Sequence, residues 1–173
     1  MSPLRSGRPD DAAALAAIAR AAYERYLPRM GFPPGPMLAD YAAVLADAEV
    51  WVAEDDGTGN EAAGNGTADE GSGDGGRRPV GFVVLVEHPD HLLLENVAVH
   101  PAHQGRGIGR ALLDHAETRA RELGLSRVRL YTHETMTENL ALYRARGYRE
   151  TARAVEDVYR RVHLAKPLHP RSG

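Results

Sequence analysis

The sequence of 173 residues contains no cysteine, which excludes disulfides, thiolate metal sites and a cysteine nucleophile. It also lacks an apolar run close to the roughly 18 residues that a membrane-spanning helix needs. Its first residues lack the apolar core of a signal peptide. Together these absences predict a cytoplasmic protein that does not engage a membrane.

An excess of positive charge is absent too. The chain has 21 Lys and Arg against 24 Asp and Glu, which gives a net charge of −3. Proteins that bind nucleic acid generally present a strongly basic face, so we expect no nucleic-acid partner. Arginines at 77–78 and over 119–129 could form a local patch, but solvated helix and strand ends are the simpler explanation. The length and the hydrophobic content of 43% suit a single globular domain over 1–173.

Large apolar residues are missing from one internal stretch, 57–78, which holds eight glycines. Such a segment cannot bury enough surface to offset the entropy of ordering it. Lengthening a surface loop costs little, because closure entropy grows only logarithmically with length. We therefore expect a flexible, glycine-rich hairpin loop inserted between two strands. A functional lid is the alternative.

Hydrophobic periodicity divides the rest of the chain into helices and strands. Asp10 and Asp11 suit the start of a helix, and Gly124 and Gly147 suit the ends of two others. The expected helices cover 10–28, 37–46, 108–123 and 137–146, and the expected strands cover 50–54, 79–87, 92–99, 127–133, 148–154 and 158–165. This order predicts an α/β (α+β) fold, in which a mixed sheet carries helices on both faces.

The glycine segment 104–109, with sequence QGRGIG, stands between an apolar strand and an amphipathic helix. A helix N-terminus offers free N–H groups to an anion, and glycine lets the backbone approach a phosphate closely. The segment is not a P-loop, because Gly109 is followed by Arg110 and Ala111, and its glycine spacing is not that of a Rossmann fingerprint. It does match [Gln/Arg]-x-x-Gly-x-[Gly/Ala], although the glycines alone would also suit a tight turn.

Two stretches resemble the GNAT (Gcn5-related N-acetyltransferase) superfamily. Residues 92–113, LLLENVAVHPAHQGRGIGRALL, look like its acyl-CoA-binding motif, and residues 139–148, NLALYRARGY, resemble its second motif, commonly Ala-x-x-x-Tyr-x-x-x-Gly-[Phe/Tyr]. The resemblance extends over about residues 4–168. It implies a mostly antiparallel central sheet of six to seven strands, with helices on both faces and a splayed central strand pair. The stretch 57–78 is the main departure.

The resemblance also implies an activity, the transfer of an acetyl group from acetyl-CoA to a primary amine of a small molecule or a protein. The amine would attack the thioester directly, with no metal and no covalent enzyme intermediate. Backbone groups of the fourth strand would pair with the pantetheine arm, and the amide of Val97 would stabilise the developing oxyanion. The pyrophosphate would lie on the glycine segment. The implied coenzyme-binding residues of these two parts are Val97, Ala98, Val99, Gln104, Gly105, Arg106, Gly107, Ile108, Gly109 and Arg110.

Two residues of the second motif are implied to act on the coenzyme. Tyr143 stands where the family often places the acid that protonates the departing thiolate. A surface hydroxyl on an amphipathic helix is the plainer interpretation. Asn139 could hydrogen-bond to CoA, or simply begin its helix. Many relatives carry the asparagine seven residues before the tyrosine, where this sequence has Met136.

The general base is less determined by the sequence. Glu95 is the best candidate, because a carboxylate in an apolar strand is costly unless it is paired or used. Simple strand alternation would place it on the same side as Val97 and Val99. A structural hydrogen bond would explain Glu95 equally well. His133, at the end of the fifth strand, is a second candidate for the base or for a substrate contact.

The acceptor amine and the oligomeric state, monomer or homodimer, are not predictable from these patterns. Tyr23, Tyr26 and the proline-rich segment 28–36 are expected to shape the acceptor side. Two rival functions remain open. One is a non-catalytic acyl-CoA-binding module that senses CoA or regulates a partner, and the other is a nucleotide-binding domain of a different fold.

Overall fold

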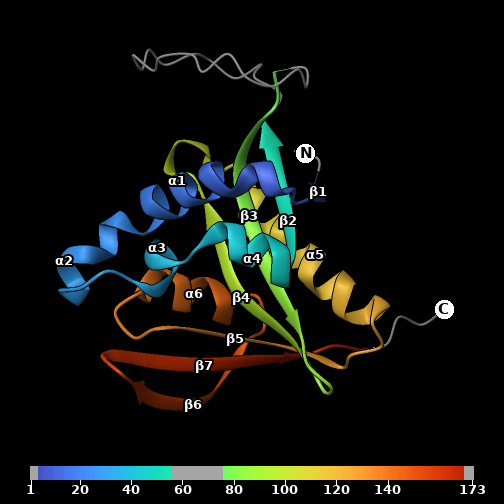
Figure 1. Cartoon of the computed structure of the whole chain (residues 1–173). Coiled ribbons are helices and arrows are strands. Elements are labelled where there is room, and N and C mark those ends of the chain that lie inside the picture. Colours follow the sequence, from blue (N-terminus) through green and yellow to red (C-terminus); the bar gives the residue numbers. More distant parts are fainter. Residues whose placement is uncertain (1–3, 56–75, 170–173) are drawn as a thin grey trace.

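The computed structural model describes residues 4–55 and 76–169 as one seven-stranded sheet with helices on both faces (Figure 1). The strand order is β1-β2-β3-β4-β5-β7-β6, and every neighbouring pair is antiparallel except β4 and β5. The predicted fold class is therefore confirmed. The strands are β1 (Leu4–Ser6), β2 (Glu49–Asp55), β3 (Arg78–Glu87), β4 (Leu92–Val99), β5 (Arg127–His133), β6 (Arg149–Glu156) and β7 (Tyr159–Pro167).

The helical elements lie close to their predicted positions. They are η1 (Pro9–Asp11), α1 (Ala12–Tyr23), η2 (Glu24–Tyr26), α2 (Leu27–Met30), α3 (Gly35–Leu38), α4 (Tyr41–Asp47), η3 (Pro101–His103), α5 (Ile108–Glu122) and α6 (Thr137–Ala145). The single helix predicted over 37–46 is wrong. Ala39 is extended, and the Asp40 carboxylate then caps α4 by accepting from the backbone amides of Ala42 and Ala43.

Strand β1 was not predicted, because three residues are too few to show a hydrophobic period. Ion pairs of Arg5 hold this strand in place. Its guanidinium pairs with Asp11 at 2.8 Å and with Glu54 at 2.9 Å. Both carboxylates are buried, so the pairing anchors the start of the chain to β2 and to the start of α1. The prediction of a flexible loop over 57–78 falls largely on residues outside the described ranges, although the flanking strands β2 and β3 do pair as a hairpin.

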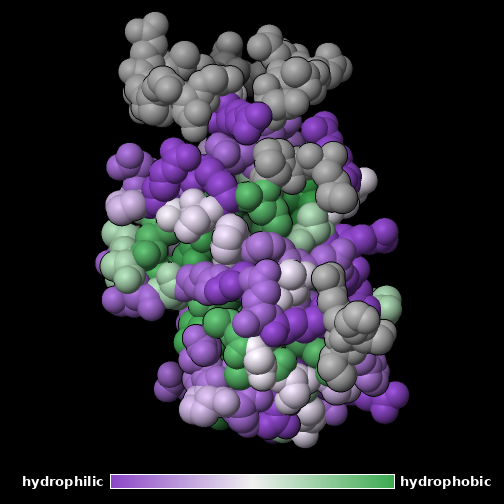
Figure 2. All heavy atoms as spheres, turned by 90° about the vertical axis from the view of Figure 1, so that its right-hand side faces the viewer, coloured by the Kyte–Doolittle hydropathy of each residue, from purple (hydrophilic) through white to green (hydrophobic). Residues whose placement is uncertain are grey.

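Two hydrophobic clusters hold the sheet between its helices. On one face α5 packs Leu112, Leu113 and Ala116 against β3, β4 and β5. On the other face α1 and α4 pack over Phe82 and Val84 of β3. The side of the molecule on which α5 lies is mostly hydrophilic outside, with smaller hydrophobic areas between the polar side chains (Figure 2). In the part of the chain that the structure describes, no helix is both long and apolar enough to span a membrane.

Strand β4 has a bulge on its β3 side and an unpaired edge on its β5 side. Val84 pairs with Asn96 but the next residue, Leu85, pairs with Leu94, so Glu95 has no partner on β3. Such a bulge shifts the alternation of the strand by one residue. On its other edge β4 pairs with β5 only over Leu92–Leu94, and the two strands then separate. The splayed central pair is thus confirmed.

Candidate active site

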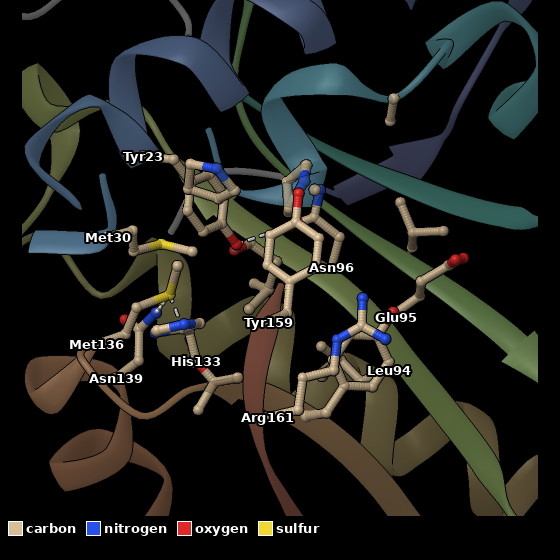
Figure 3. Close-up of a pocket in the computed structure, with 18 of the residues that line it drawn as sticks. Tyr23, Met30, Leu94, Glu95, Asn96, His133, Met136, Asn139, Tyr159 and Arg161 are labelled. Atoms are coloured by element: carbon tan, nitrogen blue, oxygen red, sulfur yellow. Dashed lines mark hydrogen bonds between the residues drawn. The ribbon is translucent and has the colours of Figure 1, made fainter. Parts of the chain in front are cut away.

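A cavity of about 250 Å³ opens where β4 and β5 separate, and side chains from both layers of the fold line it (Figure 3). Its walls come from α1, the proline-rich segment before α4, the second half of β4, the ends of β5 and β7, and α6. Of the residues proposed from the sequence, Glu95, Val97, Asn139 and Tyr143 meet in this pocket, and so does Tyr23 on the opposite wall.

The open edge of β4 carries backbone groups that no strand uses. The Tyr23 hydroxyl shares its single proton between Asn96 Oδ1 and the Val97 carbonyl, which lies 3.1 Å away, and the Val99 carbonyl accepts from the Gln104 side chain at 3.1 Å. In an extended strand the N–H and C=O of one residue point to the same side. The amides of Val97 and Val99 therefore face the opening, whereas the Ala98 carbonyl lies against Gly81 of β3.

A buried hydrogen-bond network fixes the geometry of this edge. The Tyr23 hydroxyl donates to Asn96 Oδ1 at 2.8 Å, Asn96 Nδ2 donates to the Tyr41 hydroxyl at 3.1 Å, and Tyr41 donates to the Pro36 carbonyl at 2.6 Å. Burial raises the pKa of Tyr41 to about 12, so the phenol stays protonated. Asn96 was not predicted as a site residue. A second polar residue beside Glu95 in an apolar strand is the signal that could have identified it.

The glycine segment forms an open turn at the start of α5. Gly105 and Gly107 both have φ of +82°, and a Cβ at either position would meet no atom within 4 Å. Glycine is favoured at these two positions because of the left-handed backbone conformation and not because a side chain would clash. The space beside the turn is therefore free. The dipole of the 15-residue helix α5 adds partial positive charge at this turn.

Side chains fasten this turn to its neighbours. Gln104 donates to the Val99 carbonyl and accepts from Arg25 Nη2 at 2.9 Å, so its amide braces the loop between β4 and η2. Arg106 and Arg110 are exposed, whereas the side chain of Ile108 is buried in the core beneath the loop. Arg25 is a cation beside the turn that was not predicted from the sequence.

Tyr143 is buried at 6% exposure, yet it forms part of the pocket wall. Its ring packs edge-on against that of Tyr148, with 5.9 Å between centroids. Among the residues that the structure describes, none hydrogen-bonds to its hydroxyl. Burial raises the pKa of Tyr143 well above its usual range, which keeps the phenol protonated and able to donate. Asn139, one turn earlier on α6, contacts Met136 Sδ at 3.7 Å and also lines the pocket.

Glu95 lines the pocket, but it lies on a different face of the sheet from the one that strand alternation predicts. Val97 and Val99 pack against the same cluster as Leu94, so the bulge separates Glu95 from their side of the sheet. The expectation that alternation places Glu95 with Val97 and Val99 is wrong for that reason. Glu95 is instead an exposed carboxylate at the pocket wall, and its charge contributes to raising the pKa of Tyr41 and of Tyr131.

His133 lines the same pocket but is less suited to be a base. Its Nδ1 accepts a hydrogen bond from the backbone amide of Thr135 at 3.2 Å, so the neutral ring carries its proton on Nε2. Burial lowers the pKa of His133, which favours this neutral form. The ring therefore offers a donor to the pocket, and Glu95 is the better candidate to accept a proton.

Arg161 and Tyr159 of β7 complete the wall, and neither was predicted from the sequence. Arginine and tyrosine are ordinary residues of an exposed strand, so their position in the chain gives no signal. They enter the pocket because β7 pairs with β5, which places Arg161 opposite His133. The Tyr159 hydroxyl donates to the Pro33 carbonyl at 3.0 Å and so closes the pocket from the proline-rich side.

Comparison with known proteins gives a family match and many similar structures. A model described as the acetyltransferase (GNAT) family matches residues 15–148. A structure described as a GCN5-related N-acetyltransferase (aminotransferase, class-II) from Rhodopseudomonas palustris is 24% identical, with a TM-score of 0.66 over 97% of this chain and 96% of that chain. The ribosomal-protein-S18-alanine N-acetyltransferase from Escherichia coli is 20% identical, with a TM-score of 0.67 over 100% and 97%. The PaiA N-acetyltransferase from Thermoplasma acidophilum, in complex with coenzyme A, is 17% identical, with a TM-score of 0.69 over 96% and 99%.

Proposed function

The chain belongs to the acetyltransferase (GNAT) family, and we propose that it transfers an acetyl group from acetyl-CoA to a primary amine by direct attack on the thioester. One observation carries the proposal. Strand β4 connects three parts of the site. Val97 lines the pocket that also contains Tyr143, the open edge of β4 continues to Val99, and Gln104 of the glycine turn hydrogen-bonds to the Val99 carbonyl. That sequence of parts suits an elongated ligand with an acyl group at one end and phosphates at the other.

The residues present fit acetyl-CoA. The N-terminus of α5 would take the pyrophosphate through the backbone amides of the turn 104–110, with Arg106 and Arg110 adding positive charge. The amides of Val97 and Val99 would pair with the pantetheine arm, while Ala98 would line the strand without offering a free carbonyl. Asn139 and Tyr143 would meet the thiol end of the coenzyme.

We expect Gly107→Ala to weaken acetyl-CoA binding by about 5- to 30-fold. An L-residue in the left-handed conformation costs about 1–2 kcal/mol, and relief of that strain would move the amides that follow it. Isothermal titration with acetyl-CoA measures the change in Kd.

Gly124→Ala is the matched control for this change. Gly124 ends the same helix with φ of +73° and equally open space around it. The substitution should cost similar stability but leave Kd unchanged. Equal Kd values for wild type and Gly107→Ala would contradict the pyrophosphate assignment.

The chemistry assigned to the chain's own groups balances without a covalent intermediate. Glu95 accepts a proton from the ammonium form of the amine, and the neutral nitrogen then bonds to the thioester carbon. The Val97 amide donates to the carbonyl oxygen as negative charge develops on it. The carbon–sulfur bond breaks, and the Tyr143 hydroxyl gives its proton to the leaving thiolate. The nitrogen loses its remaining extra proton as the amide forms, and that proton restores the Tyr143 hydroxyl, while Glu95 releases its own proton to solvent.

The function is tested by a turnover screen of acetyl-CoA against a panel of primary amines, in which released free thiol is measured. The panel includes amino acids, their amides, polyamines, aminoglycosides and short peptides. We expect saturable thiol release with at least one class and acetylated product by mass spectrometry. Tight acetyl-CoA binding without turnover of any amine would instead favour an acyl-CoA-binding module.

A further inference from the structure

The charged side chains that line the pocket are one carboxylate and one guanidinium, Glu95 on β4 and Arg161 on β7. Figure 3 draws both on the right of the pocket, with Met136 and Asn139 on the left. His133 adds no charge in its neutral form. The mechanism uses Glu95 but gives no role to Arg161. A cation kept in the wall of a pocket for an amine, which itself arrives positively charged, requires another explanation.

Arg161 is held in one orientation by its neighbours. Its guanidinium carbon lies 4.5 Å from the centroid of the Tyr131 ring and 5.4 Å from that of Tyr159. Stacking on aromatic faces fixes the plane of the guanidinium and lowers the entropy cost of binding a ligand to it. Tyr131, Tyr159 and Arg161 all line the pocket, so this plane forms part of its wall.

Only one edge of the guanidinium has an ion-pair partner. Nη1 of Arg161 bonds to the Glu156 carboxylate. Within 4–55 and 76–169, no group accepts a hydrogen bond from its Nε or Nη2. Those two donors form one of the edges on which an arginine binds a carboxylate through two parallel hydrogen bonds. Glu156 thus positions the guanidinium while leaving a carboxylate-binding edge free.

Building on the proposed function, we propose that the acceptor is a small amine that carries a carboxylate, of the size of an amino acid, with its carboxylate on Arg161 and its amine near Glu95. The signs of the two charges match those of a zwitterion. The pocket of about 250 Å³ would also have to hold the acyl end of the coenzyme, and Tyr159 closes its far side against Pro33, so space would remain for a small acceptor only.

The test compares amino acids with their α-carboxamides, which keep the amine and the side chain but lose the negative charge. We expect wild-type kcat/KM to favour the acids by about 10- to 100-fold, as a charge-assisted pair of hydrogen bonds would give. Arg161→Gln should abolish this preference, because kcat/KM for the acids falls by about that factor relative to kcat/KM for the amides. Arg160→Gln is the matched control, since Arg160 lies outside the pocket, pairs with Glu134 and should not affect the preference.

Three outcomes separate the possibilities. Equal or better use of amides by the wild-type enzyme overturns this proposal while leaving acetyl transfer intact, and it needs no variant to fold. Loss of the preference in Arg161→Gln alone supports it. If no amine turns over, the proposed function fails, and titration of amino acids and amides into the CoA-saturated protein then tests Arg161 by binding. Equal binding of acids and amides in that titration overturns the proposal.

Discussion

Replacing Tyr143 with phenylalanine should lower kcat by about 10²- to 10⁴-fold while the protein stays folded. The ring packs against Tyr148, and phenylalanine preserves that contact. The hydroxyl has no hydrogen-bond partner in the described part of the chain, so its removal leaves no buried group unsatisfied. What is lost is a proton donor that burial keeps protonated. Thiol release at saturating substrates and a thermal melt measure the two effects separately.

Tyr148→Phe provides a matched control for the loss of a buried phenol. Tyr148 is 2% exposed, its hydroxyl likewise has no partner among the described residues, and it lies outside the pocket. This variant should retain wild-type kcat. If Tyr143→Phe kept kcat within twofold of wild type, the leaving thiolate would not need this acid and the assignment would be withdrawn.

Glu95→Gln should lower kcat/KM by a similar factor near neutral pH and change the pH profile. Without the carboxylate the enzyme depends on amine that is already neutral, and that fraction rises about tenfold per pH unit below the amine pKa. The variant should therefore recover activity as pH rises toward the amine pKa. Because Glu95 is exposed and lies at a bulge, the substitution should cost little stability.

Glu87→Gln tests whether the loss of any carboxylate from the β3–β4 hairpin has the same effect. Glu87 is exposed and lies at the end of β3, away from the pocket. Its variant should keep both the rate and the profile of the wild type. If Glu95→Gln left kcat/KM and the pH profile unchanged, Glu95 would not be the general base. Water would then accept the proton of the amine.

The parts of the fold that depend on local pattern were predictable from the sequence. Helix α5 and strand β4 are long and strongly periodic, and the turn between them contains Gly105 and Gly107, whose left-handed conformations favour glycine. A break within a helix and a very short strand were harder to predict from the sequence. The interruption between α3 and α4 arises from the cap at Asp40, and β1 is too short to show a period.

By itself, then, the sequence determined the glycine turn, the order of the longer helices and strands, and the position of Tyr143, because each is encoded by neighbours in the chain. Only the tertiary structure decided which residues line the pocket. The bulge that separates Glu95 from the face of Val97 and Val99 depends on the register between β3 and β4. Arg161 enters the pocket because β7, which follows β6 in the chain, inserts beside β5 in the sheet. Such contacts join residues far apart in sequence, so no local period records them.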